Sequence, residues 1–151
     1  MSNGDAGVRA QLSAVDAIID GFAALHQAAM QATDAAQASI RVAQSQTTAE
    51  HQGRQRALSR AEGARAAADR ALAACKENCG PLQRAVAAAR IEEDRCRRRV
   101  DASSKAMTIV TSASSQFAGK APAFRNVVDT HARTGKASAS RYRDQVRQYL
   151  S

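Results

Sequence analysis

The sequence has few of the residues that build sheets and break helices. It contains no Trp, 3% aromatic residues, 2 Pro and 8 Gly in 151 positions. An all-β core depends on aromatic and β-branched side chains, and collagen depends on frequent Gly and Pro, so neither class fits. Alanine fills close to a quarter of the chain and has the lowest intrinsic cost in a helix. We therefore expect an all-α fold.

Long apolar segments are also absent. The longest charge-free segments are Gly21–Thr33 and Ala106–Gly119, and a bilayer span needs about 20 mostly apolar residues. The first residues lack the basic region and apolar core of a signal peptide. Three cysteines, an odd number, fit a reducing cytosol better than a disulfide framework. These features predict a cytoplasmic protein without a transmembrane segment, and leave leaderless secretion open.

Positive charge dominates, but it is unevenly distributed. The net charge is +8, made up of −3 in residues 1–50, +6 in residues 51–100 and +5 in residues 101–151. An acidic first third beside a basic remainder indicates either intramolecular complementarity or an anionic partner.

A first heptad seam, meaning a row of positions at alternating steps of four and three residues, runs from Val8 to Thr47 and contains no charged residue. This spacing is typical of a coiled coil. Beside the seam, Ile18, Leu25 and Ala32 widen the apolar stripe, as in a helix that touches two neighbours. The seam consists of Val8, Leu12, Val15, Ile19, Phe22, His26, Ala29, Thr33, Ala36, Ile40, Ala43 and Thr47.

A second seam in a different frame runs from Leu58 to Phe117. Its members are Leu58, Ala61, Arg65, Ala68, Leu72, Cys75, Cys79, Leu82, Val86, Ala89, Glu93, Cys96, Val100, Ser103, Met107, Val110, Ser114 and Phe117. The change of frame at residues 50–54, which include Gly53, predicts a turn. Gly80-Pro81 predicts a break or sharp kink, with an uninterrupted helix as the alternative.

Beyond Phe117, residues 118–122 predict another break, and Gly135 divides the remainder into two short helices. The last of these has Tyr142, Val146, Tyr149 and Leu150 on its apolar side. We expect one helical domain over residues 1–151, an elongated antiparallel helical hairpin or coiled-coil bundle with a short C-terminal helical pair. The helices are expected at about residues 7–49, 55–79, 81–118, 122–134 and 137–150.

The cysteines allow several interpretations. Cys75 and Cys79 are four residues apart, and both, like Cys96, occupy seam positions. Free Cys behaves as a small buried hydrophobe, so core packing is the favoured interpretation for all three. A redox pair or intersubunit disulfide is the alternative, and zinc ligation is the weakest, because structural zinc usually needs four ligands.

No catalytic or cofactor motif is present. The three His are scattered, and no P-loop or nucleophile motif occurs. His26, on the seam, is expected to set the register. The cluster Glu92-Glu93-Asp94 is expected to form salt bridges on a solvated helix surface with the Arg residues that follow. We expect no enzyme activity, no cofactor and no metal.

The sequence favours a non-enzymatic helical interaction protein: an adaptor, scaffold or bacterial secretion-partner module that binds other helical chains through its heptad seams, as a homo-oligomer or obligate heteromer. The expected interface comprises Val8, Leu12, Val15, Ile19, Phe22, Leu25, Ile40, Leu72, Leu82, Val86, Val100, Met107, Val110 and Phe117. One alternative is a basic, sequence-non-specific nucleic-acid-associated protein with an anion-binding patch at Arg95, Arg97, Arg98 and Arg99. Another is an effector or partner switched by its cysteines.

Overall fold

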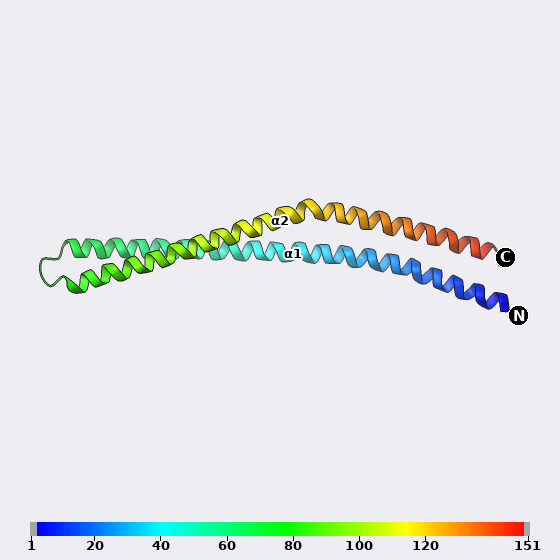
Figure 1. Cartoon of the computed structure of the whole chain (residues 1–151), viewed down its shortest axis with the longest axis horizontal. Coiled ribbons are helices and arrows are strands. Elements are labelled where there is room, and N and C mark those ends of the chain that lie inside the picture. Colours follow the sequence, from blue (N-terminus) through cyan, green and yellow to red (C-terminus); the bar gives the residue numbers. More distant parts are fainter. Residues whose placement is uncertain (1–2, 150–151) are drawn as a thin grey trace. The chain divides into compact units, whose positions relative to one another are not determined.

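Two long helices account for nearly all of the structure, a computed structural model that describes residues 3–149, with side chains described from residue 6. Helix α1 (Asn3–Ala73) and helix α2 (Gly80–Gln148) are joined by a loop at residues 74–79. No strand occurs among these residues. The helices pack against each other as an antiparallel hairpin (Figure 1). The expected all-α hairpin is confirmed, whereas the short C-terminal helical pair is not formed.

The chain divides into two compact units, and each contains a length of both helices. Unit 1 consists of the described residues up to Ala38 together with those from Gln116 on, and unit 2 is Ser39–Ser115. In both units α1 and α2 bury a shared seam, so each unit has its own narrow core.

Both predicted seams are confirmed as the packed face of the hairpin, except at Cys75 and Cys79, which lie in the loop between the helices. Every seam position in both predicted rows is buried or half-buried, while most residues between them are exposed. The most buried apolar residues are Val15 and Ile19 in unit 1 and Ala61, Val86 and Cys96 in unit 2. Among the described residues no large side chain is completely buried. A core of two alanine-rich helices therefore contributes little apolar area for its length.

The predicted turn at residues 50–54 is wrong, because α1 continues through it without interruption. The half-buried positions there are Thr47, His51, Arg54 and Leu58, so the step from Ala43 to Thr47 is followed by a second step of four. A straight helix has 3.6 residues per turn and drifts about 20° per heptad against a 3.5-residue repeat. One extra four-residue step brings the seam back to face the opposite helix. It shifts the heptad positions of all the seam residues that follow, and the helix continues.

The predicted breaks at residues 118–122 and at Gly135 are also wrong, since α2 includes Pro122 and Gly135. After Phe117 the half-buried positions are Ala121 and Arg125, again two successive steps of four. Pro122 lies on the exposed side of the helix. Leu150 lies outside the described residues.

The break at Gly80-Pro81 is confirmed, although α1 ends six residues earlier than expected. The last turn of α1 closes with hydrogen bonds from the Ala74 amide to the Arg70 carbonyl and from the Cys75 amide to the Leu72 carbonyl, each 3.1 Å. Asn78 reverses the chain with a φ of 56°, a conformation that Asn tolerates better than most residues. Pro81 then lies in the first turn of α2, where its missing N–H is not needed.

Candidate interaction surface

Most of the residues expected to bind a partner are occupied within the hairpin. The side chains of Val8, Leu12, Val15, Ile19, Phe22, Ile40, Leu72, Leu82, Val86, Val100, Met107, Val110 and Phe117 are buried or half-buried in the seam. Leu25 is the exception, with 62% of its surface exposed. In the hairpin these seam side chains are covered by the opposite helix. Their contact with another chain stays a prediction.

Leu25 belongs to an apolar row beside the seam in unit 1. Ile18, Leu25 and Ala32 follow one another at seven-residue intervals, each one position before a seam residue, and all three are exposed. Across a shallow groove from Ala32 lies Phe124 of α2, itself 51% exposed. We call Ile18, Leu25, Ala32 and Phe124 the apolar flank. The groove is otherwise lined by Thr33, Ala36, Phe117, Lys120 and Ala121.

The surface of α1 next to the apolar flank is small and uncharged. Gly21, Ala24, Ala28 and Ala35 are all exposed, and no charged residue occurs from Gly21 to Thr33. Helix faces in contact with water normally carry charged and polar side chains. This face can therefore lose its water with little penalty, and its small side chains let another helix approach closely.

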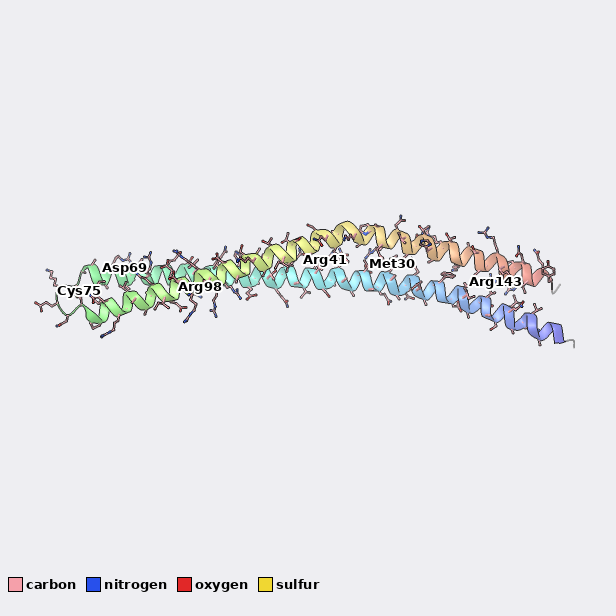
Figure 2. All side chains as sticks on the ribbon, in the orientation of Figure 1. Met30, Arg41, Asp69, Cys75, Arg98 and Arg143 are labelled. Carbon is pink, nitrogen blue, oxygen red and sulfur yellow. A yellow bond between two sulfur atoms is a disulfide. The ribbon has the colours of Figure 1, made fainter. Side chains whose placement is uncertain are left out.

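The acidic beginning of the chain pairs with its basic end. In unit 1, Asp16 meets Arg143 at 3.4 Å, Asp34 pairs with Arg125, and His26 Nε2 lies 3.3 Å from Asp129 Oδ1. These contacts join α1 to α2 (Figure 2 labels Arg143). Of the two explanations for the uneven charge, intramolecular complementarity accounts for these residues. The predicted register role of His26 fits its position and its contact with Asp129.

The basic patch is partly neutralised by acids. The Arg95 guanidinium lies 3.0 Å from Glu92, and that of Arg97 lies 2.6 Å from Glu93 and 3.8 Å from Glu62. The guanidinium groups of Arg98 and Arg99 are exposed, and neither has an ion pair within the described part of the chain (Figure 2 labels Arg98). The expected anion-binding patch is therefore reduced to these two side chains.

One ion pair lies within the seam itself. Arg65 Nε and Glu93 Oε2 are 2.5 Å apart, although the N–H does not point along a hydrogen bond to that oxygen. Only 6% of the Glu93 side chain is exposed, against 39% for Arg65. The solvated position expected for Glu93 is thus wrong, while Glu92 is exposed as expected. Opposite charges at seam positions of both helices were the signal that sequence reasoning missed.

A second polar contact crosses the seam in the same unit. His51 Nδ1 lies 2.8 Å from the Ser103 hydroxyl, which donates its own proton to the Val100 carbonyl. On the other side of the ring, the Gln55 side-chain nitrogen is 2.9 Å from His51 Nε2. A neutral imidazole with its proton on Nδ1 satisfies all three contacts. Polar seam positions of this kind specify register.

The cysteines fall into two classes. Cys75 and Cys79 form a disulfide in the loop, with Cα atoms 5.9 Å apart (Figure 2 labels Cys75), whereas Cys96 is free and buried in the seam. Core packing is therefore correct for Cys96 and wrong for the other two, because the chain reversal removes them from the helix and brings their sulfurs together. In the part of the chain that the structure describes, no group of three His, Cys, Asp or Glu side chains is placed to hold a metal ion.

No protein-family model, curated protein or solved structure matches the chain. Among the described residues, neither helix has a stretch long and apolar enough to cross a membrane.

Proposed function

We propose that the chain is a non-enzymatic helical interaction protein, an adaptor, scaffold or secretion-partner module, and that it binds an amphipathic helix of a partner on the apolar flank. The observation that carries the proposal is the exposure of Ile18, Leu25 and Phe124, between half and two thirds of each surface, next to an uncharged face of α1. Contiguous exposed apolar surface of this kind marks interaction sites.

The spacing of the flank fits a third helix. Ile18, Leu25 and Ala32 repeat every seven residues, so they present one continuous line to a helix that packs alongside α1. Full burial of a large apolar side chain contributes about 1.5–3 kcal/mol, and roughly half of that is still available at each of the three large flank residues. Lys120 at the groove favours a partner with an acidic residue beside its apolar stripe.

Site-specific photo-crosslinking tests this proposal. A benzophenone side chain placed at Leu25 in the native host should give a protein adduct of discrete mass, and the adduct's crosslinked peptide should have apolar residues at heptad spacing. Ile91 is the matched control position, because it is equally exposed at 61% but has Asp94 and Arg95 one turn away. The control should give no such adduct.

A charge on the flank should weaken binding without unfolding the chain. With the purified partner, Leu25→Asp is expected to weaken binding at least tenfold, whereas the melting temperature changes little because surface substitutions usually alter stability by about 0.5 kcal/mol or less. Adducts that are equal at positions 25 and 91, or an unchanged affinity of Leu25→Asp, would rule out the flank as the binding surface.

A second candidate function is sequence-non-specific nucleic-acid binding by unit 2. The observation in its favour is that Arg56, Arg60, Arg70, Arg98 and Arg99 are exposed, without an acidic partner for their guanidinium groups in the described chain. Binding through phosphate contacts falls steeply with salt. A mobility shift of duplex DNA and single-stranded RNA at low salt that disappears at high salt would support this function, and no shift at low salt would remove it.

A further inference from the structure

The heptad phase continues through the loop that joins the helices. Leu72 near the end of α1, Cys75 and Cys79 in the loop, and Leu82 at the start of α2 keep the three- and four-residue steps of the seams on either side. A loop has no need of this spacing, because the periodicity places side chains together only when the residues are helical. The loop sequence is therefore compatible with a helix whose seam passes through both cysteines.

The disulfide keeps these residues out of a helix. Side chains four residues apart on an α-helix have Cβ atoms about 5–6 Å apart, whereas a disulfide requires a separation of about 3.5–4.5 Å. Cys75 and Cys79 are four residues apart and bonded to each other, and Asn78 between them has a left-handed φ. A closed bridge and an uninterrupted helix exclude each other at residues 75–79.

We propose that reduction of the Cys75–Cys79 disulfide lets residues 74–79 become helical, so that α1 and α2 join, and that the seam then binds a second copy of this chain. In the resulting symmetric dimer, α1 of each copy packs against α2 of the other. In the oxidised protein, the seam residues of α1 and α2 pack against each other within one chain, which gives the hairpin.

The contacts of the hairpin can be retained in such an exchange. The His51–Ser103 and Arg65–Glu93 contacts are both centred on residues within the Cys75–Cys79 segment. A twofold axis through that segment therefore re-forms each contact twice between two antiparallel copies, in the same register. The two forms then differ chiefly at the segment that the disulfide controls.

Gly80 and Pro81 oppose a continuous helix, but the chain already accommodates a Gly and a Pro three residues apart within one helix. Helix α2 runs without interruption through Gly119 and Pro122. Pro81 in a joined helix would lose one hydrogen bond and impose a kink, and neither effect changes the phase of the seam on the two sides.

The chemical step is a thiol–disulfide exchange with a dithiol reductant. The reductant supplies two electrons and two protons: the S–S bond breaks, Cys75 and Cys79 become thiols, and the two sulfurs of the reductant form a disulfide. In the exchanged dimer the two 75–79 segments lie antiparallel, which places Cys75 of one copy across from Cys79 of the other. Re-oxidation of the dimer by a small-molecule disulfide, which takes up two electrons and two protons for each bond formed and is itself reduced to two thiols, should therefore yield disulfides between copies.

Sedimentation equilibrium of the full chain tests the proposal. A Cys96→Ser background removes the third thiol. Without reductant the mass should be that of the 16.0 kDa chain, and with dithiothreitol it should rise with concentration to twice that value. The Cys75→Ser/Cys79→Ser chain should be dimeric even without reductant. In that chain Asn78→Ala should raise the dimer fraction and Asn78→Gly, which favours the reversed chain, should lower it.

Isotope mixing identifies the exchange. When ¹⁵N-labelled and unlabelled chains are mixed, reduced and re-oxidised, mass spectrometry should find disulfide-linked peptides that combine both isotopes, and Leu25→Asp should leave this result unchanged. Three results would each overturn the proposal: a Cys75→Ser/Cys79→Ser chain that is fully helical by circular dichroism yet monomeric at every concentration, disulfides only within chains of one isotope, or a dimer lost through Leu25→Asp. The first two results do not bear on helix binding by the flank, which is tested with the oxidised monomer, and the third would assign the dimer contact to the flank instead of the seam.

Discussion

Because Gly135 has no side chain, it leaves space for the ring of Phe22. A Cβ atom built at this position would overlap the ring of Phe22 on the opposite helix, whereas a Cβ at Gly119 in the same helix would meet nothing within 4 Å. Sequence reasoning read Gly135 as a helix end, because glycine is the usual residue there. Its actual role is to receive the Phe22 ring, and only the pairing of two distant segments reveals that.

Gly135→Ala should therefore destabilise the protein, by about 1–3 kcal/mol for the forced displacement of Phe22, despite the helix-propensity gain of about 1 kcal/mol from replacing Gly with Ala. Gly119→Ala should stabilise it by about 1 kcal/mol, since that site gains propensity alone. In a Phe22→Ala background Gly135→Ala should become stabilising too. Urea unfolding followed by circular dichroism measures all three. Equal stabilisation by the two single substitutions would show that Phe22 does not need the space at Gly135.

The Arg65–Glu93 pair gives a second residue-scale test. Replacing Arg65 with Met leaves the nearly buried Glu93 with Arg97 as its remaining partner. Breaking a buried pair costs about 3–5 kcal/mol, and we expect about 1–3 kcal/mol because Arg65 is 39% exposed. Arg65→Leu/Glu93→Leu should regain most of the loss, since both seam positions are then apolar. Glu92→Gln, at an ion pair whose side chains are 51% and 61% exposed, should change stability by less than about 0.5 kcal/mol. Equal losses from Arg65→Met and Glu92→Gln would contradict a role for the pair in the seam.

At the scale of elements, heptad spacing identified the buried face as far as Phe117 but not where the helices end. Beyond Phe117 it was wrong, because Tyr142 and Tyr149, predicted on the apolar side of the last helix, are 50% and 91% exposed. The seams could be predicted because, in a core of two helices, small and apolar residues recur along the chain at regular heptad spacing. The helix ends could not be predicted in the same way, because a change of frame occurs within a helix as well as at a turn. At residues 43–51 and again at 117–125, two successive four-residue steps are a correction within one helix, and Gly53 or Pro122 nearby is incidental.

Continuity of α1 at Gly53 predicts opposite effects for two substitutions. Gly53 is exposed and a Cβ there would meet nothing within 4 Å, so Gly53→Ala should raise the free energy of unfolding by about 1 kcal/mol. Gly53→Pro should lower it by about 3 kcal/mol or more, because proline in a helix interior removes a hydrogen bond and clashes with the preceding turn. A turn at residues 50–54 would tolerate both Ala and Pro. If thermal unfolding shows that Gly53→Pro leaves the stability nearly unchanged, the result would contradict a continuous helix and support a turn at this position.

For the molecule as a whole, the sequence predicts a hairpin and a partner, but it does not show which surface packs within the hairpin and which is free to bind the partner. Of the apolar flank, the sequence indicates only Ile18, Leu25 and Ala32, as a widening of the seam, because exposure depends on where α2 lies. The disulfide was one of several interpretations, because cysteine spacing alone does not distinguish a helix from a reversal of the chain. Both features follow from the pairing of α1 with α2, which no local pattern contains.

Pairing within one chain and pairing between copies differ in how stability depends on concentration. The melting temperature of the oxidised hairpin should be independent of protein concentration, since unfolding of one chain involves no other. In dithiothreitol at low protein concentration the melting temperature should fall, because loss of a disulfide that closes so short a loop lowers the free energy of unfolding by about 2 kcal/mol. As the protein concentration rises the melting temperature should recover, because association stabilises the folded state by mass action. Differential scanning calorimetry over a hundredfold range of concentration measures this. Parallel, concentration-independent transitions in both redox states would mean that the seam closes on itself whether or not Cys75 and Cys79 are joined.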